Sequence, residues 1–396
     1  MLSGIWPAAA SFVLCLLAIV ALRPIAVAVD LIDRPGGRKS HHGNVPIVGG
    51  LAMFLGVSLG VGLVSTTGSS GTVFLAAAAL LVTVGLLDDR FELSPGARLP
   101  VQIAAALVLM LGAGAAVVTL GAPFGTGAIE LEGLASHVFT VLAIVGAINA
   151  FNMLDGMDGL AGMAAVVALS ALGFFSYAGG FTEGAALCAV VVGAVGAFLI
   201  FNLPMRLNRG LRCFMGDGGS SLLGIAVAWM CIQVSQQPKP LVAPVTVLWV
   251  VALPLFELFW TVLRRIIRGV SPFRADNDHF HHLLLRSGIG VRGAFTVFLA
   301  LSTLLALTGV LLERAGVSQS LSFALLVAAG VAVVRLMYVI GRFWRYVPEP
   351  LRRMPPLDHV ESFGRVEPIP LSAEPVARMP RGRRRTRGRS SRHGNC

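Results

Sequence analysis

Apolar stretches recur along almost the whole chain and are separated by short polar segments. A helix needs about 20 apolar residues to cross the hydrocarbon core of a bilayer, so each stretch is a candidate transmembrane helix. We place eleven of them, at roughly 5–29, 47–66, 71–87, 99–120, 136–151, 161–179, 183–203, 219–235, 241–263, 293–312 and 319–341. The pattern predicts an all-α polytopic membrane protein with about eleven transmembrane helices.

Basic residues are concentrated in every second connection between these stretches. The basic residues of those connections are Arg34, Arg38, Lys39, Arg90, Arg98, Arg206, Arg209, Arg212, Arg264, Arg265, Arg268, Arg274, Arg286 and Arg292. The opposite connections contain only Lys239 and Arg314. Because Lys and Arg accumulate in cytoplasmic loops, we expect the N-terminus outside and the C-terminus in the cytoplasm.

Composition supports a membrane protein and limits the alternatives. Of 396 residues, 56% are apolar and 13% are charged, and the mean hydropathy is +0.80. The net charge is +11, but a large share of the basic residues follows Arg342, so we expect no nucleic-acid partner. We therefore divide the chain into a transmembrane domain, 1–341, and a basic, disordered cytoplasmic tail, 342–396.

The polar residues that could take part in catalysis or ligand binding all fall in the connections that are rich in basic residues. Five clusters contain them: 33–50, 88–98, 149–158, 202–221 and 264–292. Solvated loops without a function would spread Asp, Asn and His over both faces of the membrane. The distribution therefore predicts one active site, formed by cytoplasmic loops.

Asp88 and Asp89 end an apolar stretch as adjacent carboxylates. Their mutual repulsion calls for a nearby cation or for protonation of one of them. A divalent metal would supply the positive charge, and so would a basic side chain. The alternative is a solvated helix end with Arg90 as the partner.

A second cluster, from Asn149 to Gly162, is rich in Asn, Asp and Gly. In a continuous helix Asn152, Asp155 and Asp158 would share one face, since they are spaced by three residues. Such hard oxygen ligands suit Mg²⁺ or Mn²⁺ together with phosphate oxygens. We therefore predict that this face serves phosphate chemistry.

Two further clusters fit phosphate binding. Glycines around Asp217 precede an apolar stretch, where backbone N–H groups at a helix start could meet a phosphate. His279, His281 and the arginines around them, Arg274 among them, suit a pyrophosphate. The alternatives are a helix cap after a glycine turn and a basic loop with incidental histidines.

The ordered set of motifs resembles the polyprenyl-phosphate N-acetylhexosamine-1-phosphate transferase family (glycosyltransferase family 4). The similar stretches are 33–50, 87–95, 149–162, 214–220 and 271–283, within a match that covers about residues 1–340. The resemblance implies a Mg²⁺-dependent reaction, with Mn²⁺ as a substitute, in the bacterial inner membrane. The phosphate of a polyprenyl lipid attacks the β-phosphorus of a UDP-sugar and releases UMP.

The resemblance also implies roles for individual residues. Asp217 and Asn152 would bind the metal. Asp88 and Asp89 would lie at the lipid phosphate, and Arg98 would reach a phosphate. Asp158 would contact the uracil, supported by Asp155. The residues that would line the diphosphate and sugar are His279, His281, His282 and Arg274.

The same resemblance favours UDP-GlcNAc and undecaprenyl phosphate as substrates, at the start of an O-antigen-type polysaccharide. Other UDP-N-acetyl sugars stay open. UDP-MurNAc-pentapeptide is a weaker alternative, because the corresponding loop of the relatives that use it carries three consecutive histidines and lacks the Ser-Pro-Phe sequence that begins at Ser271 in this chain. A membrane transporter and a scaffold are alternatives of a different class, and a homodimer is left open.

Overall fold

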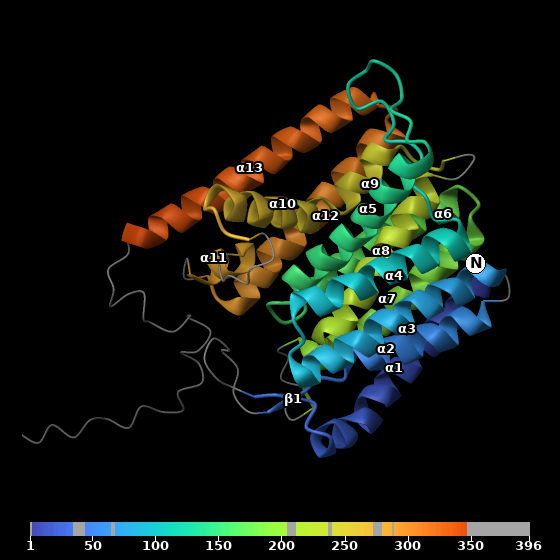
Figure 1. The fold of residues 1–396 in the computed structure, drawn as a ribbon, viewed down its shortest axis with the longest axis vertical. Coiled ribbons are helices and arrows are strands. Elements are labelled where there is room, and N and C mark those ends of the chain that lie inside the picture. Colours follow the sequence, from blue (N-terminus) through green and yellow to red (C-terminus); the bar gives the residue numbers. More distant parts are fainter. Residues whose placement is uncertain are drawn as a thin grey trace, which may run out of the picture.

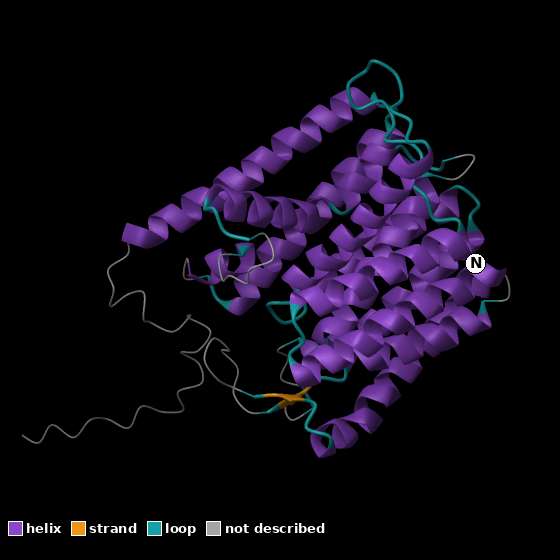
Figure 2. Cartoon of the chain, viewed as in Figure 1, coloured by secondary structure: helices purple, strands orange, loops and turns teal. Residues whose placement is uncertain are grey.

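The computed structural model describes residues 2–34, 44–64, 68–203, 211–236, 240–271, 279–286 and 289–346, and most of them are helical (Figures 1 and 2). The helices are α1 (Leu2–Ala28), α2 (Gly49–Leu63), α3 (Gly68–Phe91), α4 (Pro95–Ala113), α5 (Gly133–Leu154), α6 (Leu160–Ala178), α7 (Thr182–Asn202), α8 (Gly216–Ser235), α9 (Pro244–Val250), α10 (Ala252–Ile267), α11 (Phe280–Arg286), α12 (Val291–Arg314) and α13 (Gln319–Tyr346). Two short strands, β1 (Ile32–Asp33) and β2 (Val45–Pro46), pair antiparallel.

Within the described ranges, nine helices are long and apolar enough to cross a membrane, and the bent pair α9–α10 would make a tenth span. Each predicted stretch corresponds to one of these helices, to that pair, or to the shorter apolar helix α2. The chain is a polytopic membrane protein. The predicted number of about eleven spans depends on whether α2, with 15 residues, crosses the bilayer.

Two predicted spans differ from the helices that form. The stretch 99–120 is helical only to Ala113, because Gly114 turns the backbone into the left-handed region with φ of 63°. The stretch 241–263 bends by 82° between α9 and α10. Pro254 explains that bend, since its ring cannot donate to the carbonyl of Val250 and would clash with it in a straight helix.

Helix α8 lies at the centre of the bundle and is almost entirely buried. Glycines bring its first turn against two neighbours: a Cβ on Gly85 of α3 would lie 2.1 Å from the backbone N of Gly218, and a Cβ on Gly50 of α2 would lie 2.4 Å from the backbone N of Gly219. Only glycine permits such close approach. The start of α8 is therefore fixed between α2 and α3.

The polar clusters meet at one end of this bundle, as the sequence predicts. Phe214, just before α8, donates its N–H to Pro46 of β2 at 3.0 Å, and Gly49 of α2 donates to Phe214 at 2.9 Å. The ends of α3, α5 and α7 and the helix α11 also make contacts at this end of the bundle. The β1–β2 pair marks this end in Figure 1.

Separate contacts hold the opposite end. Gln236, after α8, accepts the N–H groups of Val118 and Thr119 at 3.0 Å each. Glu313 of α12 accepts the hydroxyl of Thr246 and, at 3.3 Å, the N–H of Ala243. These contacts are structural, since no predicted site residue takes part in them.

Two predictions fall partly or wholly outside the described residues. Arg274 lies there, and so does the tail from 347 onward. Helix α13 continues to Tyr346, past the predicted domain boundary at residue 341.

Candidate active site

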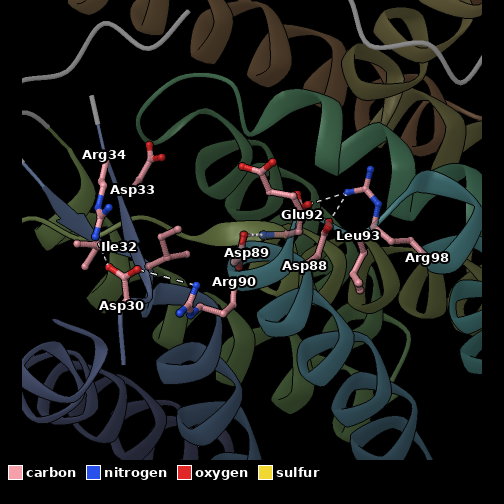
Figure 3. A pocket seen from close by; sticks show the side chains of 12 residues that line it. Asp30, Ile32, Asp33, Arg34, Asp88, Asp89, Arg90, Glu92, Leu93 and Arg98 are labelled. Carbon is pink, nitrogen blue, oxygen red and sulfur yellow. Dashed lines mark hydrogen bonds and ion pairs between the residues drawn. The ribbon is translucent and has the colours of Figure 1, made fainter. Parts of the chain in front are cut away.

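A pocket of about 530 Å³ opens at the end of the bundle where the clusters meet (Figure 3). Its walls come from the segment around β1, the end of α3, the start of α4 and the first turn of α8. The lining residues are Asp30, Ile32, Asp33, Arg34, Ile47, Asp88, Asp89, Arg90, Glu92, Leu93, Arg98 and Asp217. Most of these side chains are charged, so the pocket suits an ionic ligand.

Arg98 joins two carboxylates across this pocket. Its Nη1 donates to Oδ2 of Asp88 at 2.7 Å and to Oδ2 of Asp217 at 2.6 Å. Asp88 is only 6% exposed, and α4 begins at Pro95, so Arg98 lies one turn into a helix that starts beside the end of α3. The predicted cation beside the aspartates is therefore a basic side chain.

Arg90 is not that partner, which corrects the alternative considered from the sequence. Its Nε donates to the carbonyl oxygen of Val29 at 3.1 Å, and its Nη1 lies 3.9 Å from Oδ2 of Asp30 (Figure 3). The reason is helical geometry: residues adjacent in sequence on a helix point in different directions. Arg90 thus links α3 to the end of α1.

Asp89 contacts the first turn of α8. Its Oδ1 accepts the N–H of Asp217 at 3.1 Å. Gly216 precedes that contact with φ of 71°, and a Cβ there would lie 2.2 Å from Oδ2 of Asp89. A carboxylate at a helix N-terminus is favourable. At least one N–H of the predicted phosphate-binding turn therefore serves a carboxylate of the chain itself.

The charges at this site are unbalanced in favour of the acids. Asp88 and Asp217 share Arg98, and Asp89 accepts the backbone N–H of Asp217. Asn152 of α5 accepts the hydroxyl of Ser220, in the first turns of α8, at 2.7 Å. Asn152, Asp217 and Arg98 also line a second, smaller cavity.

In the described part of the chain, no three His, Cys, Asp or Glu side chains stand ready as a metal centre. Mg²⁺ commonly takes one or two protein carboxylates and completes its coordination with substrate phosphates and water. The excess of negative charge and the hard oxygen donors of Asp217 and Asn152 fit such a partial site.

The turn between α5 and α6 corrects the prediction of one continuous helical face. Helix α5 ends at Leu154, and α6 begins only at Leu160. Gly159 adopts φ of 75° in the connection, which ends the helical path. Asn152 therefore stays on α5 and faces α8, whereas Asp155 and Asp158 lie on a turn.

Asp155 lies in a strongly negative part of this turn. Burial, and then the charges of Asp217, Asp89 and Asp158, raise the pKa of Asp155 well above its usual value. Asn152, which precedes the turn on α5, bonds Ser220 of α8, and this contact brings the turn near the carboxylates of the pocket. A bound cation would relieve the repulsion between these carboxylates.

Asp158 is paired with Arg212, a residue that the sequence did not single out. The Arg212 guanidinium also lies 5.4 Å from the centroid of the Phe214 ring. Asn202 supports the same region by accepting the N–H of Gly159 at 2.5 Å and donating to the carbonyl of Cys213 at 3.0 Å. Their positions in the sequence could have indicated both residues: Arg212 lies just before the glycine motif, and Asn202 ends an apolar stretch.

The three histidines form a cluster. The rings of His279 and His281 are parallel within 2°, with centroids 5.8 Å apart, and His282 lies 4.2 Å from His281. His281 is 1% exposed, and its Nε2 would lie 2.4 Å from a Cβ on Gly156. The cluster therefore rests on the turn that carries Asp155 and Asp158.

The chemistry of His281 distinguishes it within this cluster. Neither of its ring nitrogens has a hydrogen-bond partner among the described residues. Burial and the neighbouring imidazoles lower the pKa of His281 well below its usual value. A buried neutral imidazole without partners can accept a ligand's hydrogen bond or donate one.

Comparison with known proteins gives a consistent result. The model of "Glycosyl transferase family 4" matches residues 72–235, which include Asp88, Asp155 and Asp217. An undecaprenyl-phosphate alpha-N-acetylglucosaminyl 1-phosphate transferase of Escherichia coli O157:H7 is 35% identical over 84% of this chain and 90% of its own length. The protein of that name from Yersinia pestis is 36% identical over 82% and 87%, and that from Haemophilus influenzae is 32% identical over 87% and 96%.

Proposed function

The chain belongs to glycosyl transferase family 4, and from that premise we propose that it transfers GlcNAc-1-phosphate from UDP-GlcNAc to undecaprenyl phosphate, releasing UMP. The observation that carries the proposal is the charged pocket at one end of a membrane bundle, with Arg98 between Asp88 and Asp217. Relatives named for this reaction align with more than four fifths of the chain. They also favour an enzyme over the transporter and scaffold alternatives.

The transfer exchanges one phosphoanhydride for another. An oxygen of the lipid phosphate forms a bond to the β-phosphorus of the nucleotide sugar. The bond between that phosphorus and the bridging oxygen breaks, and the electron pair leaves with UMP. A phosphate monoester is largely ionised near neutral pH, so positioning and charge neutralisation matter more than a general base.

The residues of the pocket supply positioning. Asp89 fixes the end of α3 against the start of α8, and Asp88 holds Arg98 of α4 beside them. Arg98 would exchange one of its two carboxylate contacts for a phosphate oxygen. A phosphate entering among three carboxylates needs added positive charge. We propose that Asp217 and Asn152 hold Mg²⁺, which neutralises the diphosphate.

The neighbouring turn and the histidines would bind the other parts of the substrate. We propose that Asp158 contacts the uracil, with Asp155 in support; Asp158 is paired with Arg212, which lies over the Phe214 ring. His279, His281 and His282 lie over the same turn and would contact the diphosphate and sugar. The nucleotide would then span from the turn to the pocket.

We also propose that this end of the bundle faces the cytoplasm of a bacterial inner membrane. The support is the excess of Lys and Arg in the connections at this end, Arg34, Arg90, Arg98 and Arg212 among them. UDP-sugars are cytoplasmic, which agrees with that orientation.

The test is UMP release by the purified chain with undecaprenyl phosphate. UDP-GlcNAc, UDP-GalNAc and UDP-MurNAc-pentapeptide are compared with and without EDTA, and Asp217→Asn is the control variant. The proposal expects release with UDP-GlcNAc alone and its loss in EDTA and in the variant. Release with another nucleotide would reassign the sugar, and release that persists in EDTA would refute the metal assignment.

A further inference from the structure

Glu257 is a buried carboxylate that the mechanism above does not use. It is 0% exposed, although it belongs to α10, whose exposed face carries Phe259, Leu263 and Ile266. The inward face of α10 is polar instead, with Glu257, Thr261 and Arg264 buried one turn apart. A buried carboxylate is costly unless it is well paired, so its contacts should explain its presence.

Those contacts fix the start of α11. Oε1 of Glu257 lies 2.9 Å from Nδ1 of His279, and the N–H of Phe280 donates to Oε1 at 3.0 Å and to Oε2 at 3.2 Å. The first N–H groups of a helix have no partner within it, and a negative charge there is favourable. Glu257 thus fixes both the orientation of the His279 ring and the position of the first residue of α11, Phe280.

The same contact determines which ring nitrogen of His279 carries the proton. A carboxylate that already accepts the N–H of Phe280 acts as an acceptor toward Nδ1 as well. Nδ1 of His279 therefore carries a proton, and Nε2 is the nitrogen on the other side of the ring. A carboxylate that orients an imidazole in this way is a common support for functional histidines.

From His279 the contacts lead to the substrate side of the site. Its ring is parallel to that of His281, and His281 rests on Gly156 in the turn that carries Asp155 and Asp158. His281 is buried, and both its ring nitrogens lack partners among the described residues. A ligand oxygen between α11 and this turn would satisfy one of them.

We propose that Glu257 is a positioning residue that holds His279 and the start of α11, so that His281 is presented to the diphosphate-sugar substrate above the turn at Gly156. This inference rests on the proposed function for the identity of the substrate. The anchoring itself is a property of the chain alone. Glu257 acts through the histidines and does not contact the substrate.

The test is a double-mutant cycle in the full chain. Glu257→Gln keeps the shape but loses the charge, Glu257→Asp keeps the charge, and His279→Ala removes the partner. We expect Glu257→Gln to melt within a few degrees of the wild type and to lower kcat about 10- to 100-fold with little change in KM. Glu257→Asp should recover part of that loss.

The cycle separates positioning from a general structural role. The double variant Glu257→Gln with His279→Ala should be about as slow as His279→Ala alone, since both act through one contact. Losses that multiply would overturn the inference. Glu313→Gln is the matched control: it removes a carboxylate that also accepts a backbone N–H, at the opposite end of the bundle, and should leave kcat unchanged.

Hydrogen–deuterium exchange tests the anchoring without turnover. Amides of 280–284 should exchange faster in Glu257→Gln than in the wild type and in Glu313→Gln. Unchanged exchange would overturn the inference whatever the substrate is. A wild type that releases no UMP, combined with faster exchange in the variant, would instead count against the proposed function and leave the anchoring supported.

Discussion

At the scale of single residues, Arg98 is the central side chain of the candidate site. One guanidinium nitrogen contacts both Asp88, which is 6% exposed, and Asp217. Removing it would leave a buried carboxylate without compensation, and hydrogen bonds to charged groups contribute about 1.5–3 kcal/mol. Arg98 is therefore important for the folding of this end, in addition to its proposed role in phosphate binding.

We expect Arg98→Gln to lower kcat/KM by about 100-fold or more and to lower the melting temperature, because Asp88 loses its partner. Arg98→Lys should keep part of the stability, since an ammonium can also donate to a carboxylate. It should keep little of the activity, since a single ammonium lacks the further N–H groups with which a guanidinium would bind a phosphate while it holds the carboxylates. Turnover and thermal unfolding in detergent measure both. Turnover of Arg98→Gln at the wild-type rate would contradict the assignment of Arg98 to the active site.

Gly216 tests the contact between Asp89 and α8. Alanine there would meet Oδ2 of Asp89 at 2.2 Å and would also strain a backbone with φ of 71°. Gly114→Ala is a matched control, because Gly114 has φ of 63° with no atom near its Cβ position. The control should cost about 1–2 kcal/mol, the price of the left-handed conformation alone.

We expect Gly216→Ala to destabilise the protein more than this control and to abolish turnover, which Gly114→Ala should retain. Paired melting curves and UMP assays make the comparison. Equal destabilisation by the two substitutions would show that the first turn of α8 tolerates displacement from Asp89.

At the scale of elements, the short helix α11 makes the stability of the fold depend on pH, because it carries the buried His281. Burial, and then His282 and His279, lower the pKa of His281 below its usual value of 6.5. The folded state therefore binds this proton less readily than the unfolded state, and its stability is lost as pH falls below about 6.5. Above that pH both states are neutral at His281.

Replacing His281 by Gln should flatten this pH dependence. The difference in melting temperature between the wild type and His281→Gln should narrow, or reverse in favour of the variant, between pH 7.5 and pH 5. His137→Gln is a suitable control, since His137 is exposed. Parallel melting curves for the wild type and His281→Gln over this range would contradict the burial of a neutral imidazole.

The elements also show what the sequence could and could not predict. Hydropathy located the helices, because each apolar stretch must satisfy its backbone hydrogen bonds internally in a bilayer. The bend at Pro254 was missed, since a hydropathy window averages over single residues. Hydropathy did separate the spans 136–151 and 161–179, but the helical face expected for Asn152, Asp155 and Asp158 was wrong, because the helix ends at Leu154. The motifs supplied Asp88, Asn152 and Asp217, whereas their contacts with Arg98 and Ser220 depend on tertiary packing.

Glu257 is an instructive omission. It is the single acidic residue in the predicted span 241–263, and an acidic residue within a span is costly enough to suggest a function. Its partners lie 22 and 23 positions away in the chain, so no local pattern identifies them. The same holds for Arg212, whose pairing with Asp158 joins two different connections.

At the scale of the whole molecule, the bundle separates a reactive end from a structural end. Asp88, Asp217 and the histidines lie at the first, and Gln236 and Glu313 hold the second together. Under the proposed function, this separation would let a water-soluble nucleotide and a membrane lipid meet at one surface of the bilayer. It also predicts that segments outside the bundle are dispensable for chemistry.

Deleting residues 350–396 should therefore leave kcat in detergent unchanged within about twofold, since none of the residues assigned to the candidate site belongs to this segment. Helix α13 ends at Tyr346, before the segment begins. UMP release by the truncated and the full chain gives the comparison. Loss of turnover in the folded truncated protein would indicate that the basic tail contributes to the site.

The most direct test of the account follows the β-phosphorus itself. UDP-GlcNAc labelled with ³²P at that position is incubated with the purified chain and undecaprenyl phosphate, and the lipid and nucleotide products are separated. Transfer of a sugar phosphate predicts that the label moves to the lipid fraction, with an equal amount of unlabelled UMP, and that Asp217→Asn abolishes both. Label that stays in the nucleotide as UDP would show transfer of the sugar alone and would contradict the central claim.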